Sequence, residues 1–302
     1  MTPFTFLLLA TALLAIFLSL ALFFPSRLSA LETPQPKPRD HPAHLLIVLG
    51  SGGHTSEMLS LLSSLPTTRY THRTYIISSG DSFSASQAAE FESSLPQTPA
   101  QPLNPQANQN GQVRSQHEIQ EEEGRLKQEQ EKDGSSSYSI HTLPRARKIH
   151  QSLLTTPWTC ALTLMSSIQL ITTLSHTLPG YPDLILTNGP ATALIVLIAS
   201  RMLKVWIQLL DLFSRRTASG QKGPMRAAEG TVKVDEDASA DGQRRKDMAR
   251  LKTMYIESWA RVRTPSLTLK LVCWLRLGDR VIVQHERLAQ LGWGEWRGDL
   301  MR

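Results

Sequence analysis

The sequence predicts an α/β protein built on a Rossmann-like, mostly parallel sheet. Short apolar runs rich in branched residues alternate along the chain with longer stretches of helical character, an order that favours parallel strands joined by helices. The first run, residues 45–49, is apolar throughout, as expected of a strand buried on both faces. Glycine and polar residues follow the runs, at the strand ends where such sheets bind ligands.

An uncharged apolar stretch, residues 3–24, precedes this region and can span a hydrocarbon core, which needs about 20 residues. A cleaved signal peptide is the alternative, but no Lys or Arg precedes the stretch and no clear small-residue cleavage site follows it. Positive side chains follow it, at Arg27, Lys37 and Arg39. The positive-inside rule therefore puts the bulk of the chain in the cytosol. We expect a transmembrane anchor at 1–25 and a proline-rich linker at 26–43.

Cysteine content and charge narrow the class of protein further. The two cysteines, Cys160 and Cys273, have neither a disulfide framework nor metal-ligand spacing, which agrees with a reducing compartment. We expect no metal and no cofactor. The net charge of +6, next to a membrane, suits contact with anionic lipid. The sequence contains no nucleic-acid-binding motif, so nucleic acid is not an expected partner.

A glycine turn follows the first strand, with the sequence Gly50, Ser51, Gly52, Gly53 and His54. Its glycines allow a tight turn and a close approach to the backbone, and Thr55 or Ser56 is predicted to cap the helix that follows. A strand, a glycine turn and a helix N-terminus together favour binding of phosphate or another anion, because free amides and the helix dipole point at one spot. The turn matches neither a P-loop nor a dinucleotide fingerprint.

The next elements are a strand at 71–79, a helix from residue 82, and a stretch rich in Gln, Pro, Asn, Ser and Glu at 93–137. That composition predicts a disordered insertion. A third strand is expected at 138–143. The basic residues after it, Arg145, Arg147 and Lys148, either begin a solvated helix or contact phosphate or lipid headgroups.

An uncharged helix is expected at 153–178, where it packs on the sheet, lies against the membrane, or does both. A short strand at 184–186 then leads into a sharp turn formed by Asn188, Gly189 and Pro190, and proline suits the first turn of the next helix. That helix, 191–210, is apolar almost all round, so it is either buried or facing lipid.

A charged, polar stretch at 214–250 predicts a second disordered insertion. A fifth strand ends near the carboxylate Glu257. Thr264 is predicted to cap the next helix, with Pro265 at its first position, and a last strand is expected at 279–284. Because the carboxyl ends of parallel strands meet at one edge, we expect the residues that follow these strands to form one site. They are the glycine turn, Arg145, Asn188, Gly189 and Glu257.

Several motifs together resemble a known family. They are GSGGHTSEM at 50–58, PRAR at 144–147, PDLILTNGP at 182–190, YIESWARVR at 255–263 and DRVIVQ at 279–284. With the N-terminal span, they resemble the membrane-anchor subunit of the eukaryotic UDP-N-acetylglucosamine transferase of asparagine-linked glycosylation, which adds the second sugar to the dolichol-linked oligosaccharide. The resemblance covers most of the chain outside the two predicted insertions.

This resemblance implies a fold similar to the N-terminal half of a two-domain GT-B glycosyltransferase, such as the bacterial enzyme that forms lipid II. It implies that a soluble catalytic subunit supplies the other half and binds UDP-GlcNAc. The chain would then anchor that partner at the cytosolic face of the endoplasmic reticulum membrane, in contact with membrane lipid. It would present dolichyl-diphosphate-GlcNAc for an inverting transfer, and it would not be active alone.

The resemblance also implies roles for particular residues. An inverting transfer needs a base near the acceptor hydroxyl and stabilisation of the departing diphosphate. His54 and Glu257 are the catalytic candidates: His54 acts as the base or as a donor to diphosphate, and Glu257 acts as the base or orients the acceptor or the turn. The substrate-binding candidates are Gly50, Ser51, Gly52, Gly53, Arg145, Asn188, Gly189, Ser258 and Arg261.

The chain departs from the family pattern in two places. Ala191 stands where the family usually has glycine, and the residues after Gln284 do not resemble the family ending, which is thought to hold the catalytic partner. Two other functions stay open. A self-sufficient membrane glycosyltransferase would need a second nucleotide-sugar domain, which we do not find after Gln284. A scaffold that has lost its site is disfavoured by the intact Gly52, Gly53, His54 and Glu257.

Overall fold

The computed structural model describes residues 42–95, 138–147, 151, 156–177, 180–189, 191–219 and 234–298. The predicted anchor at 1–25 lies outside the described residues, as do all but the last two residues of the predicted linker at 26–43. Most of the predicted insertion at 93–137 also lies outside them.

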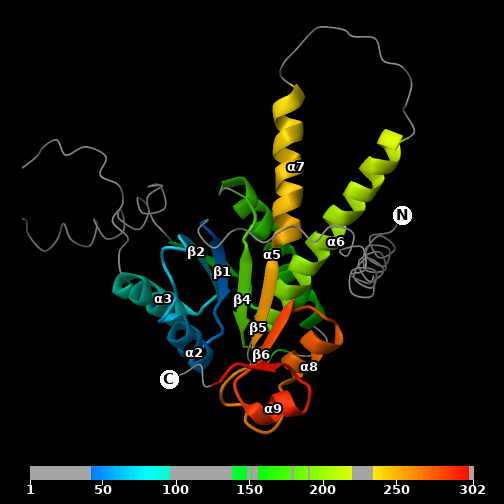
Figure 1. Cartoon of the computed structure of the whole chain (residues 1–302). Coiled ribbons are helices and arrows are strands. Elements are labelled where there is room, and N and C mark those ends of the chain that lie inside the picture. The colour runs from blue at the N-terminus through cyan, green and yellow to red at the C-terminus, as the bar shows by residue number, and fades with distance from the viewer. Residues whose placement is uncertain are drawn as a thin grey trace, which may run out of the picture.

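The described residues form a seven-stranded sheet with the order β3-β2-β1-β4-β5-β6-β7 (Figure 1). The strands are β1 (His44–Val48), β2 (His72–Ser78), β3 (Tyr138–Leu143), β4 (Leu184–Asn188), β5 (Lys252–Ile256), β6 (Arg280–Val283) and β7 (Glu295–Trp296). Every neighbouring pair is parallel. The predicted α/β class with a Rossmann-like parallel sheet is therefore confirmed.

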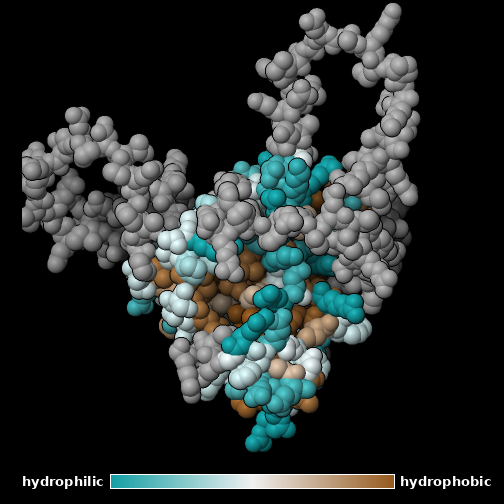
Figure 2. Space-filling view, viewed as in Figure 1, coloured by the Kyte–Doolittle hydropathy of each residue, from teal (hydrophilic) through white to brown (hydrophobic). Residues whose placement is uncertain are grey.

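Helices cover both faces of this sheet (Figure 1). They are α2 (Gly53–Leu62), α3 (Ser82–Ser94), α5 (Thr156–Thr177), α6 (Thr192–Ser219), α7 (Val234–Arg250), α8 (Leu267–Trp274) and α9 (Glu286–Gln290). The helices α2 and α3 pack on one face, and α5 and α6 pack on the other. In the space-filling view, hydrophilic side chains gather over α7, whereas apolar side chains show over the strands (Figure 2).

The strand β1 lies at the centre of this arrangement and has no exposed side chain among its apolar residues. Leu46 and Val48 pack with the helices α5 and α6, whereas Leu45 and Ile47 pack with α2, and all four are 0% exposed. An unbroken apolar run is what a strand covered on both faces requires. The prediction of a doubly buried first strand is confirmed.

Both predicted helix caps are wrong. The N-cap of α2 is Gly52, with φ 62°, and no side chain caps it. Thr55 is buried instead, and its hydroxyl donates to the Gly50 carbonyl and contacts Ser84 Oγ at 2.7 Å. The cap of α8 is Ser266 rather than Thr264, because the Ser266 hydroxyl accepts from the Leu269 amide at 3.0 Å.

The range 214–250, predicted as a disordered insertion, is helical at both of its ends. The helix α6 continues to Ser219, and α7 occupies the last part of the range. The physical reason lies in the last turns of α7, where Met248 is fully buried in the core with α5 and α6. After Gln284 the chain also adds α9 and the edge strand β7, neither of which the sequence predicted.

One described helix is long and apolar enough to cross a membrane, by length and composition alone. It is the segment Thr192–Leu210 of α6, and half of it is buried inside the described structure. A core helix of a soluble protein meets the same criterion. The burial of Val196, Leu197 and Ala199 agrees with the prediction that this segment is either buried or faces lipid.

Candidate functional site

The glycine turn lies at the carboxyl end of β1, next to the carboxyl end of β4. The chain leaves β1 toward β2 on one side, whereas β4 leads to β5 on the other. The gap between β1 and β4 is therefore the topological switch point, where ligands bind in open α/β sheets. Gly50, His54, Asn188 and Gly189 meet there, as the sequence predicted.

Two glycines make room for the imidazole of His54. A Cβ on Gly50 would lie 2.6 Å from the His54 Cβ, and a Cβ on Gly189 would lie 3.3 Å from the ring. Gly189 also has a φ of 94°, which side-chain-bearing residues rarely adopt. The ring of His54 therefore packs directly against backbone from the ends of β1 and β4.

The first amides of α2 face open space. No side chain caps the helix, and Ser51, Gly52 and Gly53 are exposed. A Cβ added at Gly53 would meet nothing within 4 Å. Uncapped amides at a helix N-terminus, together with the helix dipole, favour an anion such as a phosphate. The turn therefore leaves these amides open, and anion binding at the turn stays a prediction.

Glu57, which the sequence analysis did not select, joins three parts of the site. Its Oε2 accepts from Asn188 Nδ2 at 3.0 Å, and its Oε1 accepts from Ser258 Oγ at 2.9 Å and from the Trp259 amide at 3.1 Å. Oε2 also lies 3.5 Å from Nδ1 of His54, and the Glu57 side chain is only 15% exposed. One largely buried carboxylate thus ties α2 to the ends of β4 and β5.

These contacts change the roles of two predicted substrate-binding residues. Asn188 and Ser258 are buried, and each uses its side chain to donate to Glu57. They hold the turn in place instead of pointing at solvent. The spacing of His54 and Glu57 could have indicated that Glu57 lies at the site, because residues three apart share one face of a helix.

Glu257 follows β5 at the carboxyl edge, as predicted, but its side chain faces the protein. It is 2% exposed, and its Oε2 accepts from Ser266 Oγ at 2.7 Å while its Oε1 accepts from the Ser258 amide at 3.2 Å. Burial, and then the charge of Glu257, raise the pKa of Tyr255. Glu257 therefore links the end of β5 to the N-cap of α8.

Arg145 lies at the same edge and binds backbone. Its Nε donates to the Ser79 carbonyl at 2.7 Å, and its Nη2 donates to the Gly80 carbonyl at 3.2 Å. Arg261 lies on the exposed loop after β5. Of the two arginines predicted to bind substrate, Arg145 therefore holds the loop that follows β2. Arg261 belongs to a loop in which Trp259 and Val262 are each 49% exposed.

This arrangement suits acid–base chemistry beside an anion. The His54 side chain is 31% exposed, so it is accessible, and its buried Nδ1 lies 3.5 Å from the Glu57 carboxylate without a hydrogen bond to it. A nearby carboxylate favours a histidine that takes up a proton. Within the described ranges, no group of three or more His, Cys, Asp or Glu side chains could hold a metal. Burial raises the pKa of the Cys160 and Cys273 thiols, so both stay protonated and unreactive at neutral pH.

Fold and site together define a class: a Rossmann-like domain whose switch point carries an uncapped glycine turn and an accessible histidine. A family model described as "Oligosaccharide biosynthesis protein Alg14 like" matches residues 45–107 and 101–298. The chain therefore belongs to the Alg14-like family of oligosaccharide biosynthesis proteins. No solved structure matches the chain significantly.

Curated relatives come from fungi and mammals, and each is named as a UDP-N-acetylglucosamine transferase subunit, Alg14. The Aspergillus fumigatus protein is 37% identical over 250 residues, which are 80% of this chain and 93% of that protein. The Schizosaccharomyces pombe protein is 30% identical over 94% of this chain and 93% of its own length. The human protein is 30% identical over 53% of this chain and 57% of its own length.

Proposed function

We propose that the protein is the membrane-anchoring subunit of a heteromeric UDP-GlcNAc transferase in asparagine-linked glycosylation. It recruits a soluble catalytic subunit to the cytosolic face of the endoplasmic reticulum membrane and binds dolichyl-diphosphate-GlcNAc, to which the complex adds the second GlcNAc. The name "subunit" of the relatives supports a catalytic partner. The observation that carries the proposal is the place of His54, which lies in the uncapped first turn of α2, packs closely against Gly50 and Gly189, and has the Glu57 carboxylate 3.5 Å away.

The proposed acceptor pose follows from the charges at the turn. The diphosphate lies on the uncapped amides of α2, where the helix dipole favours negative charge. His54 takes the proton of the acceptor hydroxyl while that oxygen attacks the anomeric carbon of GlcNAc and the bond to UDP breaks. UDP is the leaving group, and it stays bound to the partner subunit until it is released. Glu257 is a positioning residue in this account, because its buried carboxylate holds the loop after β5.

Exposed apolar side chains on α5 support membrane contact beside the site. Trp158, Leu162 and Met165 are 63%, 45% and 62% exposed, and their spacing puts them on one face of the helix. The helix begins soon after the carboxyl end of β3, so this face is near the edge that carries His54. We propose that this face of α5, together with the anchor at 1–25, contacts the bilayer. The dolichyl chain of the acceptor can then stay in the hydrocarbon core of the membrane.

A second exposed apolar group supports partner docking at the carboxyl edge. Trp259 and Val262 lie in the loop after β5, and Leu267 at the start of α8 is 73% exposed. Interfaces are enriched in such aromatic and apolar side chains. We propose that the catalytic subunit covers this group, because that position brings its nucleotide sugar opposite His54.

The test is capture of the partner and transfer in one preparation. The tagged full chain is isolated from membranes, and its co-purified protein is identified by mass spectrometry. GlcNAc transfer from UDP-GlcNAc to a dolichyl-diphosphate-GlcNAc analogue is then measured with and without that protein. We expect transfer only when both are present. Transfer by the chain alone would favour a self-sufficient enzyme and contradict the proposal.

A further inference from the structure

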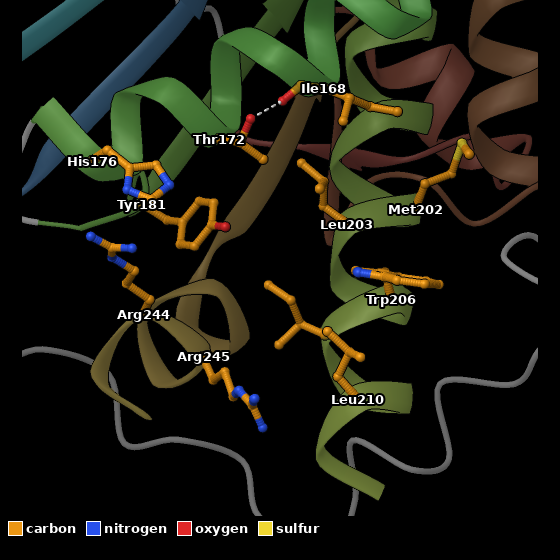
Figure 3. Close-up of a pocket in the computed structure, with 11 residues that line it drawn as sticks. Ile168, Thr172, His176, Tyr181, Met202, Leu203, Trp206, Leu210, Arg244 and Arg245 are labelled. Carbon is orange, nitrogen blue, oxygen red and sulfur yellow. Dashed lines mark hydrogen bonds between the residues drawn. The ribbon is translucent and has the colours of Figure 1, made fainter. Parts of the chain in front are cut away.

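A cavity of about 650 Å³ lies between α5, α6 and α7 (Figure 3). It is in the size range of small-molecule sites, about 300–1,000 Å³. Its lining includes Tyr181, shortly before β4 begins, and residues of α7, which leads into β5. The cavity is therefore at the amino-terminal edge of the sheet, at the opposite end of the strands from His54.

One wall of this cavity is hydrocarbon. The helix α6 contributes Met202, Leu203, Trp206, Ile207 and Leu210. On α5, Thr172 turns its hydroxyl back to donate to the Ile168 carbonyl at 2.9 Å (Figure 3), so that hydroxyl is already used by the helix backbone. An apolar chain can therefore lie along this wall without leaving the Thr172 hydroxyl buried and without a hydrogen bond.

The other wall is positively charged. The helix α7 contributes Arg244 and Arg245, and both side chains are half-buried. Among the residues whose side chains the structure describes, none forms an ion pair with Arg244. Asp247, the nearby acid on the same helix, is in contact with Arg250 at 3.7 Å and accepts from Gln243 at 3.0 Å. A half-buried guanidinium that no described acid pairs with favours an anionic partner.

Tyr181 adds a hydrogen-bond donor to the cavity. Its side chain is 9% exposed, and its hydroxyl points into the cavity (Figure 3), which it lines together with His176. A buried phenol hydroxyl usually has a hydrogen-bond partner. The Tyr181 hydroxyl points toward the apolar wall of α6, whereas the Arg244 guanidinium lies on the side of His176 (Figure 3). The positive charge and the apolar wall therefore belong to two sides of one cavity.

We propose that this cavity takes one acyl chain of an anionic membrane phospholipid, with the phosphate at Arg244. The apolar wall excludes a free nucleotide sugar, and the arginine disfavours a neutral lipid. The source is the bilayer, because the cavity borders Trp206 and Leu210, which are 50% and 38% exposed on the helix segment that is apolar enough for a membrane. Tryptophan and arginine are both typical of residues at the headgroup level, and the cytosolic leaflet is rich in anionic lipid.

Quenching of Trp206 by brominated lipids tests this site. The full chain is placed in nanodiscs that contain either phosphatidylserine or phosphatidylcholine with brominated acyl chains at equal mole fraction. The spectrum of the Trp206→Phe variant is subtracted to isolate Trp206 from the other tryptophans. We expect stronger quenching by phosphatidylserine. Arg244→Gln should lower that preference about tenfold, the effect of losing a hydrogen bond between two charged groups at a specific site.

Lys246→Gln is the matched control, because Lys246 is exposed on the same helix and does not line the cavity. It should leave the preference unchanged. Equal quenching by the two lipids, or equal effects of Arg244→Gln and Lys246→Gln, would contradict a specific site. Quenching by a brominated free fatty acid but not by phosphatidylserine would also overturn the proposal.

A second measurement does not depend on the Trp206 variant. Phospholipids that remain on the detergent-purified chain are counted by mass spectrometry. The wild-type chain and Lys246→Gln should retain anionic phospholipid, and Arg244→Gln should retain about tenfold less, because it loses a hydrogen bond between two charged groups. Equal retention in all three would show that the lipid is held elsewhere, for example by the N-terminal apolar stretch.

Discussion

The Asn188 amide donates to the Glu57 carboxylate at 3.0 Å, across 131 positions of the sequence. The same carboxylate accepts from the Ser258 hydroxyl at 2.9 Å. Glu57 therefore fixes the relative positions of α2, which carries His54, of the end of β4 and of the loop after β5. A site that depends on a narrow geometry needs such a support, because small displacements of a reacting group cost large factors in rate.

We expect Glu57→Gln to lower GlcNAc transfer by about 10- to 100-fold while the protein stays folded. Glutamine keeps the shape, but its amide nitrogen must face either Asn188 or Ser258, and both of those donate to Glu57. Losing a hydrogen bond to a charged group costs about 1.5–3 kcal/mol, and about 1.4 kcal/mol corresponds to tenfold in rate. Glu90→Gln, on the exposed face of α3, is the control. Equal turnover of the two variants would refute the supporting role.

Gly50→Ala should destabilise the protein by about 1–3 kcal/mol, the usual cost of overpacking. Its new Cβ would lie 2.6 Å from the His54 Cβ and 3.3 Å from the Asn188 carbonyl, so α2 must shift. Gly53→Ala provides the control, because a Cβ there meets nothing within 4 Å. Urea unfolding of the full chain in detergent measures both. Equal stability of Gly50→Ala and wild type would disprove the tight packing of His54 on the turn.

Asp279→Asn should reduce stability at neutral pH by about 1 kcal/mol, a value at the low end because the carboxylate is partly exposed. Burial alone would raise the pKa of Asp279, but the Lys204 charge and the hydrogen bonds from Thr253 and Lys204 outweigh it and lower the pKa. A lowered pKa contributes stability above the unfolded value, about 3.9 for aspartate, and that stability is lost as the pH falls through the folded pKa.

The difference between wild type and Asp279→Asn should therefore shrink as the pH falls below about 4. Unfolding by urea at a series of pH values follows this difference. Glu295→Gln, which removes an exposed carboxylate, should show little effect at any pH. A difference for Asp279→Asn that stays constant from neutral to acidic pH would rule out the ion pair as its cause.

The sheet could be predicted from the sequence because buried parallel strands leave a local signal. Residues 45–49 are apolar throughout, and the structure covers β1 on both faces. The place of His54 and Asn188 at one edge could be predicted too, because parallel strands align their carboxyl ends. Neither conclusion required knowledge of a contact between distant residues.

The roles of individual side chains could not be predicted, because they depend on such contacts. Ser266 caps α8 in place of Thr264, and the same hydroxyl donates to Glu257 at 2.7 Å. Both residues are suitable helix caps by type, and this contact with Glu257 favours Ser266. The composition of 234–250 is charged, yet Met248 fixes the helix in the core. A single buried residue outweighed the composition of the segment.

His54→Ala tests the central claim most directly. The variant is reconstituted in membranes with the catalytic partner, and GlcNAc transfer to a dolichyl-diphosphate-GlcNAc analogue is measured together with partner capture. A positioned proton-transfer group contributes about 10²- to 10⁴-fold, so turnover should fall within that range while capture and membrane attachment stay at the wild-type level. Wild-type turnover with normal capture would contradict a shared active site and leave the protein as an anchor alone.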